Sequence, residues 1–175
     1  MSRTVCEPEA RDARAYIASL VKSGRTPVVE VGPGKCACLT ILLAGRGIRV
    51  LAIDLEAEAV KGAHRAIRRA GLARRVRIVQ ADAARMPLRP GSVRTVIAYD
   101  ALHHAIELGA TVRGMAAVLG PGGRLIVGDE DEAGNGFLGR LARVLRASFR
   151  TVIMTPRENW RVYVCERPWV HGRRG

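Results

Sequence analysis

Acidic side chains lie in or directly after short apolar runs, at positions where they could hold a polar ligand. Glu30 is part of the run VVEV at 28–31, and Asp54 ends the run IRVLAI. Asp82 follows a third run, RVRIVQ at 75–80. A carboxylate can accept hydrogen bonds from ribose hydroxyls or from an amino group, and it can pair with an ammonium group. The spacing therefore indicates a binding site for a ligand that carries such groups.

A glycine turn, VGPGKC, separates the first of these acids from the second. Gly32 and Gly34 carry no Cβ, so the backbone can bend tightly there and leave room for a ligand against it. We expect a helix to begin near Lys35 and to point its free N–H groups into the same crevice. Dinucleotides and the methyl donor S-adenosylmethionine both use such a turn. The pattern G-x-G-x-x-A at 32–37 with Asp54 is a passable dinucleotide fingerprint, so the turn alone leaves both cofactors open.

A second group of reactive side chains follows the apolar run VRTVIAY, in the segment YDALHHA. It holds Asp100, His103 and His104. A histidine at this place could act as a general base near neutral pH. The alternative role for such a histidine is to cap or pack the helix that follows. We expect Asp100 and His103 to be the catalytic candidates that touch the acceptor substrate, and the choice between His103 and His104 stays open.

The cysteines do not predict a metal site. Cys36 and Cys38 are closer together than the usual C-x2-C pair, and Cys6 and Cys165 do not form a matching second pair. We expect Cys36 and Cys38 to be packed in the core as free thiols.

Apolar runs of strand length alternate along the chain with segments of helical periodicity. The predicted strands cover residues 27–31, 48–53, 75–80, 93–99, 124–130, 150–154 and 161–165, with a GPGG turn at 120–123. The predicted helices cover residues 7–23, 35–44, 56–70 and 136–148, and another helix carries Ile106, Val112, Met115 and Leu119. This alternation favours a doubly wound α/β fold, in which a mostly parallel sheet has helices on both faces. The last two strands, joined by a short link, favour an antiparallel pair.

Five motifs in order resemble those of the class I S-adenosylmethionine-dependent methyltransferases, most closely the group called type 11. They read VVEVGPGKC, VLAIDLE, VQADAARMPL, VIAYDALHHA and LGPGGRLIVGDE, and they span residues 28–130. The resemblance implies a methyltransferase enzyme, S-adenosylmethionine as its cofactor, and a Rossmann-like sheet of seven strands whose last strand is antiparallel.

The resemblance also implies roles at the methionine end of the cofactor. Glu30 would engage the ammonium group through water, and Gly32 and Gly34 would line the methionine moiety. The backbone of Tyr99 would lie near the same moiety. This sequence departs from the family at Cys36, where a glycine usually allows close packing of helix on strand.

The adenosine end is assigned by the same resemblance. Asp54 would bind the ribose hydroxyls, and Leu55 would pack on the adenine. Asp82 would accept a hydrogen bond from the adenine amino group, with the N–H of Ala83 beside it.

The chain has the length of one domain. We expect one methyltransferase domain over 1–169, made of an N-terminal helix (1–24), a cofactor-binding core (25–130) and a C-terminal helix with a hairpin (131–169). We expect residues 170–175 to be a mobile basic tail. No apolar run reaches membrane-spanning length and no export signal is visible, so we expect a cytoplasmic protein without a membrane partner.

The net charge of +13 comes almost entirely from arginine and predicts a phosphate-rich partner. Arginines recur at Arg140, Arg143, Arg146 and Arg150, and at Arg65, Arg68, Arg69, Arg74, Arg75 and Arg77. We therefore expect an acceptor in RNA or a ribonucleoprotein, where Trp160, Tyr163 and Trp169 could stack on bases. Acceptors among small molecules or proteins, and a non-catalytic role as the cofactor-binding subunit of a partner, are the alternatives. The arginines could equally form a solvated surface without a partner, as expected if the whole proteome of the source is rich in arginine.

One residue pattern narrows the target atom. Family members that methylate exocyclic amines of bases commonly carry Asn or Asp, two prolines and an aromatic residue after the fourth strand. Here the residues are Asp100, Ala101, Leu102 and His103, which counts against that reaction.

Overall fold

The computed structural model describes most of the chain. The described residues are 8–22, 24, 26–130, 136–157 and 159–169. The tail expected to be mobile, 170–175, lies outside them.

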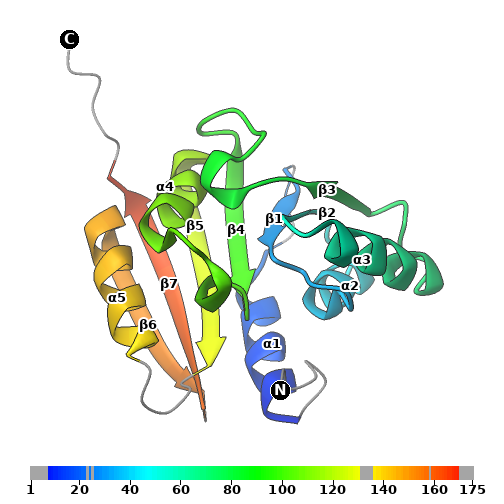
Figure 1. Ribbon diagram of the computed structural model, residues 1–175, viewed down its shortest axis with the longest axis horizontal. Coiled ribbons are helices and arrows are strands. Elements are labelled where there is room, and N and C mark those ends of the chain that lie inside the picture. The colour runs from blue at the N-terminus through cyan, green and yellow to red at the C-terminus, as the bar shows by residue number, and fades with distance from the viewer. Residues whose placement is uncertain (1–7, 23, 25, 131–135, 158, 170–175) are drawn as a thin grey trace.

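Within the described residues, seven strands form one sheet in the order β3-β2-β1-β4-β5-β7-β6 (Figure 1). The strands are β1 (Val28–Val31), β2 (Val50–Asp54), β3 (Val76–Gln80), β4 (Val93–Tyr99), β5 (Leu119–Glu130), β6 (Phe149–Arg157) and β7 (Trp160–Pro168). Neighbouring strands from β3 to β5 are parallel, and β7 is antiparallel to both β5 and β6. This arrangement confirms the predicted fold class, including the antiparallel last strand.

Helices cover both faces of the sheet. They are α1 (Pro8–Leu20), α2 (Cys38–Gly45), α3 (Ala57–Arg69), α4 (Leu108–Ala117) and α5 (Phe137–Ser148), with short 3-10 turns η1 (Ala83–Arg85) and η2 (Leu102–His104). Apolar side chains of α1 and α2 pack on one face of the sheet, as Ile17 and Leu39 do beside Val28. Those of α4 and α5 pack on the other, as Met115 and Leu141 do. None of the described helices is long and apolar enough to cross a bilayer.

Two predicted helices differ from the structure at their ends. The helix expected near Lys35 begins at Cys38, because residues 34–36 form a turn and Ala37 adopts a left-handed backbone with φ 48°. Another helix was expected to carry Ile106 and Leu119, but α4 runs only from Leu108 to Ala117, and Leu119 begins β5. The Ile106 side chain is 92% exposed.

The GPGG turn is part of β5 and does not precede it. Val93 pairs with Leu119, and Thr95 pairs with Arg124, so four residues bulge out of the ladder between these two pairs. Gly122 in this bulge has φ 68°, a conformation that glycine adopts without strain.

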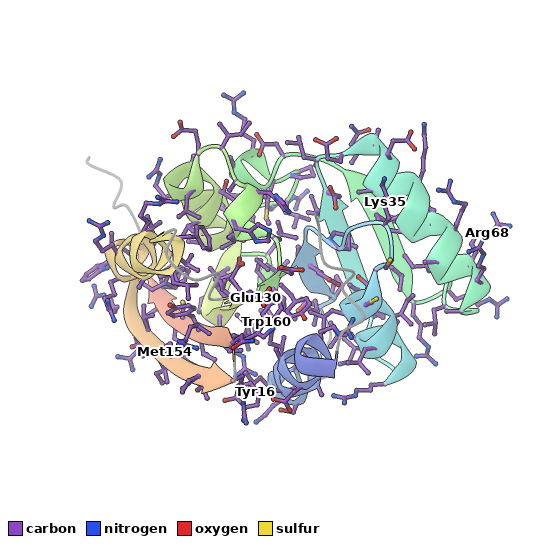
Figure 2. All side chains as sticks on the ribbon, turned by 60° about the horizontal axis from the view of Figure 1, so that its bottom comes forward. Tyr16, Lys35, Arg68, Glu130, Met154 and Trp160 are labelled. Atoms are coloured by element: carbon purple, nitrogen blue, oxygen red, sulfur yellow. The ribbon has the colours of Figure 1, made fainter. Side chains whose placement is uncertain are left out.

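The first helix is fastened to the last hairpin. The Tyr16 hydroxyl donates to Thr155 Oγ1 at 3.3 Å, and the Arg157 guanidinium lies 3.9 Å from the centre of the Tyr16 ring (Figure 2). Ile17 on the same helix approaches Gly128 so closely that a Cβ there would lie 2.6 Å from the Ile17 Cδ1. Helix α1 is thereby held against β5 near its carboxyl end, beside the strand ends that form the site.

Candidate active site

The glycine turn after β1 is tied to the end of β2. Gly32 and Gly34 have φ 70° and 62°, both in the left-handed region. The Gly32 N–H donates to Ile53 O at 2.8 Å, and the Gly34 N–H donates to Asp54 Oδ2 at 3.2 Å. A Cβ built on Gly34 meets no atom within 4 Å. The turn therefore has open space above it, as a bound ligand requires.

The adenosine-side residues gather beyond the ends of β2 and β3. Asp54 Oδ1 accepts a hydrogen bond from the Glu56 N–H at 3.0 Å, so backbone donors fix both of its oxygens. Each oxygen keeps a second lone pair with which it can accept from a ribose hydroxyl. Leu55 is 55% exposed, which offers an apolar surface for a planar ring. The contacts of Asp54 with the ribose and of Leu55 with the adenine stay predictions.

Asp82 lies beyond the end of β3 and is the N-cap of η1. Its Oδ1 accepts from the Ala84 N–H at 2.8 Å, and Ala83 is the first residue of that turn. The Gln80 amide donates to Leu55 O at 3.1 Å and joins this strand end to that of β2. Asp82 and Ala83 therefore lie on the same edge of the sheet as Asp54, and their contacts with adenine stay predictions.

Glu30 lies deeper than the other acids. Its side chain is 2% exposed, and it faces α2, because residues two apart in a strand point to the same face and Val28 packs against α2. The hydroxyl of Thr40, itself completely buried, donates to Glu30 Oε2. Burial raises the pKa of Glu30 from 4.5 to about 7; the Thr40 hydrogen bond opposes the rise, and the charge of Asp54 adds to it. Its contact with the cofactor ammonium stays a prediction, and Thr40 is a partner that the sequence pattern did not indicate.

Tyr99 offers only its backbone to the strand end. The ring is 4% exposed and stacks on Trp160, with 4.8 Å between ring centres. Burial raises the pKa of its phenol well above the usual value. Trp160 and Tyr163 are both buried, so the expectation that they stack on bases is wrong. Trp169 is 47% exposed, and the Arg150 guanidinium lies 4.5 Å from its ring centre.

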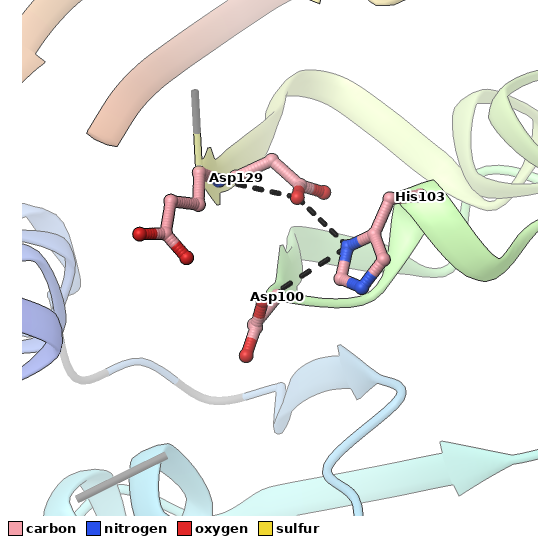
Figure 3. A network of polar contacts seen from close by, with 4 residues as sticks. Asp100, His103 and Asp129 are labelled. Carbon is pink, nitrogen blue, oxygen red and sulfur yellow. Dashed lines mark hydrogen bonds and ion pairs between the residues drawn. The ribbon is translucent and has the colours of Figure 1, made fainter. Parts of the chain in front are cut away.

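A second polar cluster lies at the carboxyl ends of β4 and β5 (Figure 3). His103 Nδ1 is 2.9 Å from Asp129 Oδ1 and 3.9 Å from Asp100 Oδ1. The backbone of Asp100 has φ 55°, which is rare for a residue with a side chain, and its N–H donates to Gly128 O at 2.8 Å. The structure therefore brings together both predicted catalytic candidates. His104 lies beside the cluster, with its ring centre 3.9 Å from that of His103.

Asp129 is the member of this cluster that the sequence reasoning missed. It is 1% exposed, and its Oδ1 faces both His103 Nδ1 and the N–H of Glu130, the latter at 3.2 Å. Its Oδ2 is buried and has no hydrogen-bond partner among the described residues. The signal was present in LIVGDE, where an acid ends an apolar run as Asp54 does.

The two groups of residues are adjacent. A Cβ added to Gly32 would lie 2.6 Å from the Ala101 Cβ, so the glycine turn touches the segment that carries Asp100 and His103. A ligand on the turn therefore has the Asp100–His103–Asp129 cluster as its neighbour on the β4 side.

The cysteines are placed differently from the expectation. Cys36 is exposed and Cys38 is partly buried, so Cys36 is not a core residue. Ala37, between them, is fully buried and packs with Ala63 and Ile67 of α3. Cys36, which stands where the family usually has a glycine, thus lies at the surface of the turn. The close contact with α3 is made by Ala37.

The sheet order, the glycine turn and the acids at the ends of β2 and β3 together define a class I S-adenosylmethionine-dependent methyltransferase. A family model described as a methyltransferase domain, type 11, matches residues 29–127, which is more than half of the 175 residues. The chain belongs to this methyltransferase family. It is an enzyme that uses S-adenosylmethionine, and the open turn, the fixed Asp54 carboxylate and the exposed Leu55 fit that cofactor.

Solved structures share this fold. An S-adenosylmethionine-dependent methyltransferase from Aquifex aeolicus has a TM-score of 0.73 at 16% identity, over 91% of this chain and 93% of that one. Geranyl diphosphate methyltransferase, in complex with GPP and sinefungin, has a TM-score of 0.69 at 13% identity, over 92% and 78%. The [4+2]-cyclase SpnF has a TM-score of 0.72 at 21% identity, over 84% of this chain but only 59% of its own. This chain thus spans less than two thirds of SpnF.

Proposed function

We propose that the enzyme methylates an oxygen atom of a small acceptor molecule that binds against Asp100, His103 and Asp129. The observation that carries this proposal is the convergence of these side chains at the ends of β4 and β5. Gly32, through its contact with Ala101, keeps them next to the cofactor turn. In sheets of this class the ligands bind beyond the carboxyl ends of the strands, so cofactor and acceptor would share one crevice.

The chemistry asks for alignment and for removal of a proton. Bound S-adenosylmethionine supplies an activated methyl group, which moves to the acceptor by in-line displacement. The protein must hold the two reacting atoms in line, and a hydroxyl acceptor must also lose its proton. All three side chains of the cluster carry a basic atom, within 4.8 Å of one another. The cluster can therefore hold a hydroxyl and help to remove its proton.

Two observations support a small acceptor. Geranyl diphosphate methyltransferase, named for a small acceptor, has the same fold over most of both chains. In addition, Trp160 and Tyr163 are buried and offer no platform for stacked bases.

An RNA acceptor is the second candidate, because the arginines predicted to form basic stripes are exposed. This holds for Arg65, Arg68, Arg69, Arg74, Arg75, Arg77, Arg140, Arg143, Arg146 and Arg150. The first six belong to α3, β3 and the segment between them, and the last four to α5 and β6. Strands β3 and β6 are opposite edges of the sheet, so an RNA that followed both groups would pass over the strand ends between them.

The test is transfer of labelled methyl from S-adenosylmethionine into small-molecule, RNA and protein fractions of a cell extract. We expect the label in the small-molecule fraction, on an oxygen atom. Asp129→Asn should keep cofactor binding and lower kcat by about 100-fold or more, the size of a lost proton-transfer contribution. Asp54→Ala should lose cofactor binding, and Glu58→Gln, an exposed change on α3, should alter neither. Label in RNA alone would support the second candidate, and full kcat in Asp129→Asn would refute the role of the cluster.

A further inference from the structure

We propose that the Asp100–His103–Asp129 cluster is a binding site for one divalent cation of the Mn²⁺ or Mg²⁺ type, which holds the acceptor oxygen. This inference rests on the proposed function for the identity of the acceptor, but the cation site itself is argued from the cluster alone.

The first argument is the spacing of the three ligand atoms. One ligand atom from each of Asp100, His103 and Asp129 lies within 4.8 Å of the other two. An octahedral ion with bonds of about 2.1 Å places neighbouring ligands about 3 Å apart and opposite ligands about 4.2 Å apart. The distance from Nδ1 to Asp129 is 2.9 Å and that from Nδ1 to Asp100 is 3.9 Å. Both distances from Nδ1 therefore already lie in the range of a common coordination sphere, and the two carboxylates need to approach each other only slightly, if at all, to share it.

The second argument is the unused oxygen of Asp129. A buried carboxylate oxygen without a partner is costly, because it has lost its water and gained no donor. Asp129 is 1% exposed and Oδ2 has no partner among the described residues (Figure 3). His103 Nδ1 contacts only Oδ1, and on binding a cation Nδ1 would exchange this contact for coordination of the ion through its lone pair. A cation beside this carboxylate would compensate the charge that the imidazole leaves unpaired.

The third argument is the way in which the ligands are held. Asp129 is the next-to-last residue of β5 and is paired within the sheet, and Asp100 keeps its uncommon backbone conformation through the N–H bond to Gly128 O. A strained residue that the surrounding structure fixes is a frequent feature of binding sites. Two carboxylate ligands favour a cation of the Mn²⁺ or Mg²⁺ type, and a preformed set of ligands reduces the cost of ordering them around the ion.

The cation would give the cluster a defined chemical task. It would bind the acceptor hydroxyl and favour its ionised form, as bound cations do for coordinated oxygen. The O–H bond breaks and the proton passes to water. The oxygen then forms the new bond to the methyl carbon while the bond from that carbon to the sulfonium breaks, which leaves a neutral thioether.

The test is a titration of the chelator-treated full chain with Mn²⁺, without cofactor or acceptor. Binding is measured as the loss of the electron paramagnetic resonance signal of free Mn²⁺. We expect one Mn²⁺ per chain. Asp129→Asn and Asp100→Asn should each weaken its binding by at least about 10- to 100-fold, since even outer-shell changes have effects of this size. Glu58→Gln is the matched control, because it removes an exposed carboxylate of α3 that pairs with Lys61. The affinity of this variant for Mn²⁺ should equal that of the parent.

Two results would overturn the cation site. One is the absence of stoichiometric Mn²⁺ binding; the other is binding that Asp100→Asn and Asp129→Asn leave unchanged while both variants keep the parent circular dichroism. Methyl transfer is measured separately, with and without chelator. Transfer to an oxygen that persists in chelator sinks the cation proposal and leaves the proposed function standing. Mn²⁺ binding without any methyl transfer to oxygen refutes the proposed function and leaves the cation site standing.

Discussion

Glu30 shows how a single buried acid can make the stability of the molecule depend on pH. It lies under α2 with Thr40 as its donor, and burial favours its protonated form. In the unfolded chain Glu30 loses its proton near pH 4.5, and in the folded chain near pH 7. Between these values the folded state binds more protons, so stability falls as pH rises through this window and is level above it.

Replacing Glu30 by Gln should remove that fall. Relative to Glu30→Gln, the parent should lose on the order of 3 kcal/mol of unfolding free energy between about pH 4.5 and about pH 7.5, because each pKa unit corresponds to about 1.4 kcal/mol. Urea unfolding of both proteins across this range measures the difference. Equal pH slopes for the two would mean that the Glu30 carboxyl is not buried as described.

The Thr40 hydroxyl should keep Glu30 partly ionised. Its hydrogen bond lowers the pKa of Glu30, so Thr40→Val should raise that pKa further and move the end of the pH window upward. Loss of a buried hydrogen bond should also cost about 1 kcal/mol of unfolding free energy. The same urea series checks both effects, and Ser19→Ala on the exposed side of α1 is the control. A window that ends at the same pH in Thr40→Val would contradict the assignment of this donor.

Individual site residues were predictable from the sequence where a single rule applied, namely that an acid directly after an apolar strand lies at the edge of the sheet. Asp54 and Asp100 follow apolar strands, and both lie at the strand ends where they were expected. Asp129 follows the same rule but was missed, because it is the first of several consecutive acids after its apolar run and the family resemblance assigned it no role. Thr40 could not have been found, because its partner lies ten positions away on another element.

At the scale of elements, the turn between β1 and α2 determines the geometry of the site. Its two glycines are unlike each other. Gly34 faces open space, whereas Gly32 packs against Ala101. Gly34 therefore serves the ligand, and Gly32 serves the contact between the cofactor turn and the acceptor cluster.

This difference predicts different outcomes for two alanine substitutions. Gly34→Ala should cost about 1–2 kcal/mol of unfolding free energy, the cost of a left-handed backbone with a Cβ. Its methyl group should also weaken cofactor binding, because it enters the open space of the turn. Gly32→Ala has the same backbone cost and also a clash with Ala101. Its unfolding free energy should therefore be lower than that of Gly34→Ala by about 1–3 kcal/mol. Thermal unfolding and calorimetric titration with S-adenosylmethionine measure both quantities. Equal stability of the two variants would contradict the contact.

The elements themselves were predicted well where apolar runs had clear ends. Strand β4 has the predicted bounds, because charged or polar residues flank its buried run. The start of α2 was placed too early, since a left-handed alanine is uncommon and no sequence rule assigns one to Ala37. The GPGG segment has the sequence of a turn. Because Leu119, directly before it, pairs with Val93 of β4, the segment is a bulge within β5.

On the scale of the whole molecule, two groups of exposed arginines lie at opposite edges of the sheet. Arg68 projects from α3 at one end, while α5 and β6 carry their arginines at the other (Figure 2). Net charge favours association with any polyanion, so binding alone says little about the substrate.

Neutralising one edge at a time separates a substrate surface from a general attraction. Replacing Arg140, Arg143 and Arg146 by Gln should lower the salt dependence of single-stranded RNA binding, with a slope smaller by about 2 for three lost phosphate contacts. The same change in Arg65, Arg68 and Arg69 should do likewise. Under the proposed function neither triple variant changes kcat/KM for the small acceptor. Filter binding at several salt concentrations and the methyl-transfer assay give the two readouts; a variant that loses RNA binding and turnover together would favour the RNA candidate.

The fastening of α1 to the last hairpin has a consequence for the order of events on the ribosome. The strands that carry the cofactor turn are synthesised long before Thr155 and Arg157, the residues that hold Tyr16. Strand β7, which is made after the other six described strands, must then enter between β5 and β6. Until it does, β5 is an open edge and α1 lacks its anchor, so the nascent chain carries an incomplete sheet that is prone to pair with other chains. The edge of β5 is therefore covered only after β7 has been synthesised and has paired with it.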